Sequence, residues 1–295
     1  MRSEQEYRGM VEASLEPQLL SLGDIPEKLR DAMRYSLMAG GKRLRPVLLL
    51  ASCEMAGGDA EKAMPYACAL EMIHTYSLIH DDLPAMDNDD LRRGKPTNHK
   101  VFGEGLAILA GDGLLNAALE LVLGTALRQG DPRGFQAAEQ LARHAGVTGM
   151  IAGQTVDVTM EGSAPTEELV SYIHTHKTSD LLQAPVEMGL TLAGCPERVT
   201  ALGREYGYHL GIAFQIVDDL LDVEGDPALM GKNTGMDGQK LTWVALRGRE
   251  GARRDAETHI RQAVAALEAM KTREGMPFET GFLEKLALDS LSRAY

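Results

Sequence analysis

Five carboxylates lie within ten residues in the segment from 81 to 90, which follows the apolar pair Leu78-Ile79. Two like charges about 4 Å apart repel by about 4 kcal/mol at an effective dielectric near 20, so such a cluster needs a counter-charge. Oxygen ligands suit Mg²⁺, which commonly shares its coordination with substrate phosphates. A charge run is more often a solvated loop, but the flanking apolar residues and the adjacent Arg92-Arg93 pair favour a divalent-cation site at a helix end.

A second acidic cluster repeats this pattern far downstream. Asp218 and Asp222 are four residues apart, so they share one helix face, and Gln215 precedes Asp218 by one turn on the same stripe. The neighbouring Ile216 and Val217 indicate a partly buried helix whose acidic stripe faces a cavity. One such motif arises by chance in acidic helices. Two of them, each ending an apolar helix, predict a shared metal site.

The elements that must position these motifs are predicted to be helices. Aromatic residues make up only 5% of the chain, and Ala, Leu, Met and Glu dominate. Apolar positions recur at steps of three and four residues, and Gly- and Pro-containing breaks separate the segments. We expect one all-α domain spanning residues 1–295, with about ten helices, among them helices that begin at Thr166 and Pro196. The segment from Leu106 to Leu127 is apolar nearly all round, so we expect it inside the bundle.

The overall composition excludes several classes of protein. The net charge of −13 argues against a nucleic-acid-binding protein, although it does not exclude an anionic substrate. The amino terminus has no apolar core typical of a secretory signal, and we expect no membrane-spanning segment and a cytoplasmic location. The three cysteines are widely spaced, which favours small buried side chains over a disulfide framework.

The two acidic motifs, DDLPAMD at 81–87 and DDLLD at 218–222, occur together with a GKRLRP segment at 41–46 and Gly231-Lys232. In this combination the chain resembles the short-chain trans-polyprenyl diphosphate synthases, closest to their bacterial farnesyl diphosphate synthase branch. The resemblance implies an all-helical isoprenoid synthase fold around a deep central cavity, a homodimer, and three Mg²⁺ ions, with Mn²⁺ as the alternative metal, that bind an allylic diphosphate. It also implies that isopentenyl diphosphate is the second substrate.

The resemblance further implies a role for each matching residue. The metal ligands would be Asp81, Asp82, Asp87, Asp218, Asp219 and Asp222. The allylic diphosphate would contact Arg92, Lys177, Lys232 and Lys240. The metal-free site for isopentenyl diphosphate would comprise Gly41, Lys42, Arg45, His74 and Arg93. Thr178 and Gln215 would line the region where the carbocation develops, with Gln154 and Asp157 beside the metals. Arg293 would belong to a basic tail that closes the site.

These roles agree with the physical demands of the reaction. Ionisation of an allylic diphosphate separates a carbocation from an anionic leaving group, and fixed cations around that group stabilise the developing charge. Arginine suits bidentate phosphate contacts, whereas lysine supplies a compact charge. An apolar cavity keeps water away from the cation. Oxygen dipoles of Thr178 and Gln215 stabilise the cation without the attack that a carboxylate could make.

Product length is predicted from the residues one turn before the first motif. Ser77 lies one turn before Asp81, on the side toward which a hydrocarbon tail would extend, and Tyr76 lies beside it. In the resembling family, an aromatic residue here, together with the two-residue insertion around Pro84, implies a C15 product. We therefore expect farnesyl diphosphate, formed in two successive condensations.

Other functions fit parts of this pattern. The same chemistry could give a C20 or C10 product. A terpene cyclase would need both metal motifs but no second diphosphate site, and a non-catalytic subunit of a heteromeric prenyltransferase would normally lack one motif. A metal phosphohydrolase is suggested by His80-Asp81 but needs further histidines. His74 could be a core histidine with a satisfied hydrogen bond. His174 and His176 do not share a helix face, so we predict no metal site there.

Overall fold

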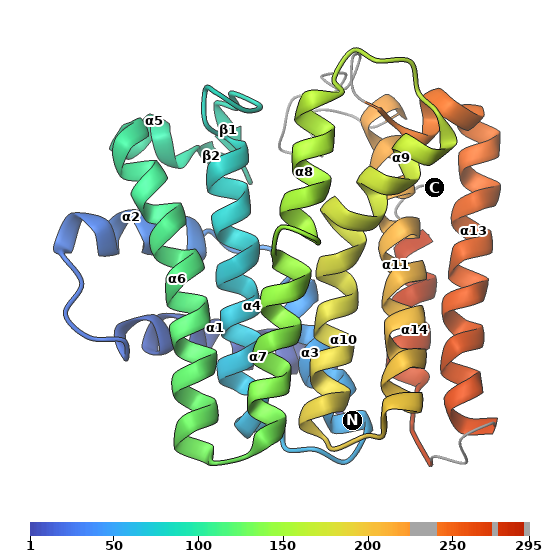
Figure 1. Cartoon of the computed structure of the whole chain (residues 1–295), viewed down its shortest axis with the longest axis horizontal. Coiled ribbons are helices and arrows are strands. Elements are labelled where there is room, and N and C mark those ends of the chain that lie inside the picture. The colour runs from blue at the N-terminus through green and yellow to red at the C-terminus, as the bar shows by residue number, and fades with distance from the viewer. Residues whose placement is uncertain (225–240, 273–276, 292–295) are drawn as a thin grey trace.

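A computed structural model describes residues 1–224, 241–272 and 277–291 of the chain. The expected all-α fold is confirmed (Figure 1). Its α-helices are α1 (Glu4–Leu20), α2 (Glu27–Leu37), α3 (Leu44–Met55), α4 (Ala60–Asp81), α5 (Asn98–Phe102), α6 (Glu104–Gln129), α7 (Pro132–Ala145), α8 (Met150–Thr159), α9 (Glu167–Ile173), α10 (Asp180–Leu192), α11 (Glu197–Glu224), α13 (Trp243–Thr272) and α14 (Gly281–Leu291). The predicted site residues Lys232, Lys240 and Arg293 lie outside the described residues.

Some of the helices begin where the sequence supplies a side-chain cap. The Asp59 carboxylate accepts hydrogen bonds from the first backbone N–H groups of α4, and the Thr166 hydroxyl accepts one from the backbone N–H of Leu169 in α9. Helix α11 begins at Glu197, directly after Pro196. The predicted helix starts at Thr166 and Pro196 are therefore confirmed.

Helix α4 forms the centre of the main hydrophobic core. It packs against α3 and α6, while α10 packs against α3, α7 and α11 (Figure 1). Leu48, Leu70 and Val186 from three of these helices are fully buried. A second apolar cluster, which includes Ile216 and Trp243, joins α11 to α13. Both motif-bearing helices are thus fixed by buried apolar contacts along their length, which is the main source of their stability.

Helix α6 differs from the expectation. It packs on one side against α2, α4, α5 and α7, but several of its large apolar side chains are exposed, namely Ile108, Leu109, Leu123 and Leu127. The prediction that this segment lies inside the bundle is therefore wrong. Among the described residues, α6 is also long and apolar enough to cross a membrane by length and composition alone, contrary to our expectation, although 44% of its apolar stretch is buried. A single such helix is weak grounds for a membrane span, because core helices of soluble proteins have the same composition.

A short hairpin follows α4 and departs slightly from the all-α expectation. Strand β1 (Leu91–Arg92) pairs antiparallel with β2 (Lys95–Pro96). The turn between the strands places Arg93 in the left-handed region, with φ of 53°. The hairpin lies at the same end of the molecule as the last turn of α4 (Figure 1), so Arg92 and Arg93 lie close to the first acidic motif.

Candidate active site

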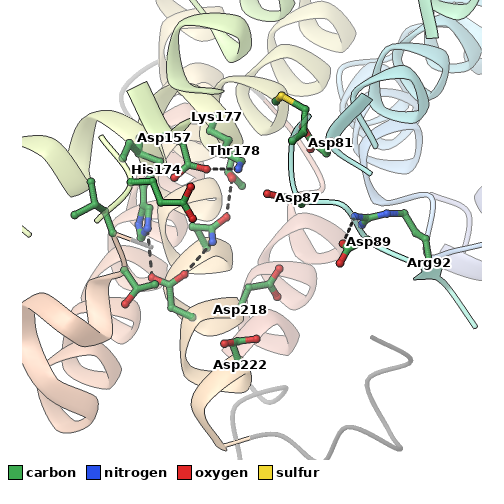
Figure 2. A pocket seen from close by; sticks show the side chains of 17 residues that line it. Asp81, Asp87, Asp89, Arg92, Asp157, His174, Lys177, Thr178, Asp218 and Asp222 are labelled. Carbon is green, nitrogen blue, oxygen red and sulfur yellow. Dashed lines mark hydrogen bonds and ion pairs between the residues drawn. The ribbon is translucent and has the colours of Figure 1, made fainter. Parts of the chain in front are cut away.

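The structure brings the two acidic motifs to one cavity of about 350 Å³ (Figure 2). Helix α4 ends at Asp81, and the irregular turn that follows returns the chain, because the Asp87 backbone N–H donates to the Asp81 carbonyl oxygen at 2.9 Å. Asp81 and Asp87 lie on one side of the cavity, opposite Asp218 and Asp222 of α11. Carboxylates from two helices far apart in the sequence therefore surround a single space.

The acidic side chains do not enclose a metal ion by themselves. Within the described part of the chain, no group of three His, Cys, Asp or Glu side chains converges closely enough to hold one. Most of the potential metal donors around the cavity are nevertheless carboxylate oxygens, the ligand type that Mg²⁺ prefers. Mg²⁺ typically takes one or two protein carboxylates and completes its octahedron with water and substrate phosphate. The donor set therefore fits ions that bind together with an anionic ligand.

Asp82 lies apart from the other predicted metal ligands. It is absent from the lining of the acidic cavity, its side chain is buried, and its carboxylate accepts a hydrogen bond from Arg92 Nε at 2.6 Å. Burial raises the pKa of Asp82 to about 6, and the hydrogen bond from Arg92 opposes this shift. Arg92 also bonds Asp89 at 3.2 Å. In this structure Asp82 positions Arg92, so its predicted role as a metal ligand does not agree with its placement.

A chain of hydrogen bonds connects the middle of the site to α11 and α13. The Thr178 hydroxyl donates to Gln215 Oε1 at 2.7 Å, and Gln215 Nε2 donates to Asp219 Oδ1 at 2.9 Å. Asp219 Oδ2 accepts the Trp243 backbone N–H at 2.7 Å and lies 3.3 Å from His174 Nε2. The predicted pair Thr178 and Gln215 is therefore held together, and Asp219 serves as its anchor.

Lys177 and Gln154 reach the site from two neighbouring elements. Lys177 Nζ forms an ion pair with Asp157 of α8, and Gln154 Nε2 donates to Asp81 Oδ1 at 2.9 Å. Both Lys177 and Asp157 line the acidic cavity (Figure 2). The structure thus places a positive charge and an amide beside the carboxylates of the first motif.

Lys177 and Thr178 lie on a π-helical turn, η1 (His174–Ser179), between α9 and α10. A Cβ atom on Gly153 of α8 would lie 2.1 Å from the Lys177 backbone nitrogen, and one on Gly211 of α11 would lie 2.5 Å from Ser179 Cα. Only glycine at these two positions lets α8 and α11 approach the turn so closely. Turns of this kind are rare in proteins overall, and those that occur frequently lie at functional sites.

A group of cations borders the site on the α3 side. Burial, followed by the nearby arginines with Arg45 first, holds the pKa of His74 well below its ordinary value. Burial also lowers the pKa of Arg45 to about 10, and the buried Arg45 Nε atom has no hydrogen-bond partner among the residues that the structure describes. An unsatisfied buried donor is costly unless a ligand completes it. Gly41 contributes closely packed backbone, because a Cβ atom there would lie 2.8 Å from Arg93 Cζ. This corner therefore has the properties of an anion-binding site.

A second cavity of about 770 Å³ adjoins the acidic one and is mostly apolar. The two cavities share Asp81, Met86, Lys177 and Thr178 as lining residues. Tyr76 and Ser77 line the apolar cavity, together with Ile108 and Leu115 of α6 and Ile151 of α8. The Tyr76 side chain is 5% exposed, and within the described part of the chain its buried hydroxyl has no hydrogen-bond partner. The site therefore combines a charged chamber with an apolar one.

Sequence reasoning missed several residues that support the site. Arg43 is fully buried with φ of 51°, and its guanidinium bonds Glu71 at 2.7 Å, Glu12 at 2.9 Å and the Leu37 carbonyl. This network fixes the junction between the loop that carries Lys42 and the first turn of α3, which carries Arg45. His174 supports Asp219 from the π turn. The sequence contains one signal of this network, which is the position of Glu71 within the apolar run of α4. A glutamate buried there needs a counter-ion.

Residues 26–274, most of the chain, match the family described as Polyprenyl synthetase. The chain belongs to this family. This polyprenyl synthetase is 49% identical over 261 residues to the farnesyl diphosphate synthase of Geobacillus stearothermophilus, a match that covers 88% of each chain. It is 46% identical over 255 residues to a chloroplastic geranylgeranyl pyrophosphate synthase of Capsicum annuum, covering 85% of this chain and 69% of the relative.

Solved structures give the same family. A geranyltransferase of Helicobacter pylori, complexed with magnesium and isoprenyl diphosphate, is similar to this polyprenyl synthetase with a TM-score of 0.81 at 31% identity. The match covers 99% of this chain and 97% of that one. The chain is therefore a short-chain prenyltransferase by family, and its relatives include synthases of both farnesyl and geranylgeranyl diphosphate.

Proposed function

We propose that this chain is a (2E,6E)-farnesyl diphosphate synthase. It condenses isopentenyl diphosphate with dimethylallyl diphosphate and then with geranyl diphosphate, and releases diphosphate. The single observation that carries the proposal is the pair of adjoining chambers, one acidic and one apolar, with Tyr76 on the wall of the apolar one. An allylic diphosphate has a charged end and a hydrocarbon end, which match these two chambers. The identity to a farnesyl diphosphate synthase also supports the C15 product.

The donor set of the acidic chamber fits Mg²⁺, and the metal supplies charge that stabilises the departing diphosphate. The ions would be held by Asp81, Asp87, Asp218 and Asp222. We expect three ions. Lys177 and Arg92 contribute fixed positive charge toward the same leaving group. The two arginines of the α3 side, Arg45 and Arg93, would bind the diphosphate of isopentenyl diphosphate.

The described side chains also protect and guide the reacting carbon atoms. The Thr178–Gln215 hydrogen bond fixes two oxygen-bearing groups at the boundary of the two chambers, where they can stabilise an allylic cation. The apolar walls exclude water, which would otherwise capture that cation as an alcohol. The released diphosphate takes up the final proton, so no protein base is assigned.

The test is an incubation of the purified protein with isopentenyl diphosphate, geranyl diphosphate and Mg²⁺, followed by chromatography of the products. Farnesyl diphosphate as the main product supports the proposal. Geranylgeranyl diphosphate as the main product contradicts the assignment of Tyr76 as the limit of chain length. An absence of condensation, with geranyl diphosphate recovered intact, contradicts catalysis and leaves the non-catalytic subunit as the alternative.

The Arg45→Gln variant is expected to bind isopentenyl diphosphate poorly. A hydrogen bond to a charged group is worth about 1.5–3 kcal/mol, so its Michaelis constant should rise roughly 10- to 100-fold. The Michaelis constant for geranyl diphosphate should change by less than about threefold, because Arg45 does not line the acidic chamber. Steady-state kinetics with each substrate varied in turn measure both values. Arg261→Gln on the exposed face of α13 is the matched control, and equal effects on both substrates would contradict the assignment.

We also propose that the protein is a homodimer and that it is cytoplasmic. The exposed apolar side chains of α6, together with the exposed Phe135 of α7, support a dimer because a second copy would cover them. Light scattering coupled to size-exclusion chromatography should give twice the chain mass of 32.0 kDa. A mass of one chain at micromolar concentration would contradict the dimer.

A further inference from the structure

The π turn η1 depends on support from outside its own hydrogen-bond ladder. It carries Lys177 and Thr178, which line both chambers. A π turn is intrinsically less favourable than an α-helix and persists where its surroundings determine it. Gly153 and Gly211 explain how the neighbouring helices fit against the turn, but these glycines provide no polar contact that sets the orientation of its side chains.

Besides the contacts of its own residues to Asp157, Gln215, Asp219 and Tyr208, the turn is joined to a group of polar contacts centred on Asp180, the residue that directly follows it. Asp180 Oδ2 lies 2.9 Å from His176 Nδ1, so the carboxylate binds back to the residue before Lys177. Asp180 Oδ1 accepts a hydrogen bond from Gln183 Nε2 at 3.2 Å and lies 3.3 Å from His144 Nδ1 of α7. The Tyr172 ring packs on the His176 ring at a centroid distance of 4.4 Å. His176 and Asp180 therefore bracket Lys177 and Thr178 in the sequence and are joined to each other.

His144 connects the His176–Asp180 pair to the interior of the protein. Its side chain is 3% exposed, and its Nε2 atom lies 2.7 Å from Glu187 Oε2, so the ring is held between two carboxylates of α10. Glu187 is in turn bound by Arg143 of α7 at 3.0 Å and by Arg204 of α11 at 2.7 Å. The His176–Asp180 pair is thus connected to α7, α10 and α11 through groups of alternating charge.

The electrostatics of this cluster favour a protonated His144. Burial lowers the pKa of His144, but its hydrogen bonds to Asp180 and Glu187 together raise the pKa above its ordinary value. Burial acts to raise the pKa of Glu187, yet His144, Arg204 and Arg143 bring it to about 2. With both ring nitrogens bonded to carboxylates, a protonated ring donates two hydrogen bonds, whereas a neutral ring can donate only one.

We propose that Asp180, His144 and Glu187 form a positioning relay that orients the π turn and thereby sets where Lys177 and Thr178 meet the allylic diphosphate. Asp180 and His144 are positioning residues, because neither lines the acidic or the apolar chamber. The relay rests on the proposed function of the site. It predicts that changes in the relay selectively weaken the binding and use of the allylic substrate. The isopentenyl diphosphate corner should be unaffected, because it is built from α3, α4 and the hairpin.

The first test is the Asp180→Asn variant, which keeps the size of the side chain and removes its charge. Misplacement of a substrate-positioning group by about 1 Å can cost about 100-fold, so kcat/KM for geranyl diphosphate should fall roughly 10- to 100-fold. The Michaelis constant for isopentenyl diphosphate should stay within about twofold. Asp31→Asn on α2, whose side chain is 51% exposed and pairs with Arg30, is the matched control and should resemble the wild type. An Asp180→Asn enzyme with wild-type kinetics for both substrates would overturn the relay.

The second test uses the pH dependence of kcat/KM to distinguish an effect on the orientation of the π turn from an effect on the stability of the fold. Because the folded-state pKa of His144 is raised, its contribution is fully present below about pH 6.5 and is lost as the pH rises through the raised value. The wild-type kcat/KM for geranyl diphosphate should therefore contain an alkaline loss that the His144→Gln variant lacks. The facing groups Arg143, Arg204 and His176 are unchanged in both proteins. Identical pH profiles for the two proteins would overturn the relay, as would a variant whose only defect is a lower melting temperature.

A third measurement distinguishes failure of the relay from failure of the proposed function. Calorimetry of inorganic diphosphate binding in the presence of Mg²⁺ requires no turnover. If the wild type binds diphosphate but makes no prenyl product, the proposed function fails, and weaker binding by Asp180→Asn still supports the relay. If the wild type is an active synthase and Asp180→Asn binds diphosphate equally well, the relay is wrong and the proposed function stands.

Discussion

The Asp218→Asn enzyme is expected to lose at least about 100-fold in kcat, the order of effect that follows removal of one preorganised electrostatic group. The asparagine keeps the shape of the side chain but replaces a charged ligand with a neutral amide. Asp218 lies on the cavity wall opposite Asp81 and Asp87 (Figure 2), so its charge acts on the same space as theirs. Steady-state kinetics over a range of Mg²⁺ concentrations measure the loss.

The dependence on Mg²⁺ makes this prediction specific. Half-maximal activity of the variant should require several-fold more Mg²⁺, because one carboxylate no longer helps to hold an ion. The Asp31→Asn variant is the control, since its side chain is 51% exposed on α2 and pairs with Arg30. Melting curves establish that both variants fold. Wild-type turnover and wild-type Mg²⁺ dependence in Asp218→Asn would contradict a metal-binding role for the second motif.

The Tyr76→Ala enzyme is expected to form products longer than C15, with geranylgeranyl diphosphate prominent among them. The Tyr76 ring lies on the wall of the apolar chamber, and its removal extends the space into which the hydrocarbon can grow. Its hydroxyl has no hydrogen-bond partner in residues 1–224, 241–272 and 277–291, and burial raises the pKa of Tyr76 to about 12, so the ring acts here as an apolar barrier. Chromatography of dephosphorylated products measures the chain-length distribution.

The Tyr76→Phe enzyme provides the matched comparison. Phenylalanine keeps the ring and removes only the unpartnered hydroxyl, so the product should stay C15. Truncation of a buried aromatic residue costs about 3–5 kcal/mol, and the melting temperature of Tyr76→Ala should therefore fall. An unchanged C15 product from a folded Tyr76→Ala enzyme would show that another part of the wall limits the chain.

The sequence predicted the motif-bearing helices well, because local signals determine where they end. The first acidic motif follows an apolar run, and α4 does end at Asp81. Pro84 disfavours a continuing helix, and the turn after α4 accordingly returns Asp87 toward the cavity. Asp218, Asp222 and Gln215 share one face by helical spacing alone, and all three line the same chamber.

Features that depend on contacts between distant segments could not be predicted. The π turn at Lys177 arises where Gly153 and Gly211 let two helices pack closely, and neither glycine is near it in sequence. Asp82 is adjacent to Asp81, yet its carboxylate pairs with Arg92 and does not line the acidic cavity. The exposed apolar face of α6 shows a related limit, since hydrophobicity does not reveal which side other helices will cover.

The adjoining chambers also determine the direction in which a substrate can enter. A molecule with a multiply charged head and an oily tail is favoured in one orientation, since the reverse arrangement would place the tail among the carboxylates and the head beside the apolar wall of Tyr76, Leu115 and Ile151. Moving such a charge out of water into apolar surroundings costs several kcal/mol per ion at least. The protein therefore distinguishes the charged end of an amphiphile from its apolar end by the difference in their solvation, before any specific recognition of the carbon skeleton begins.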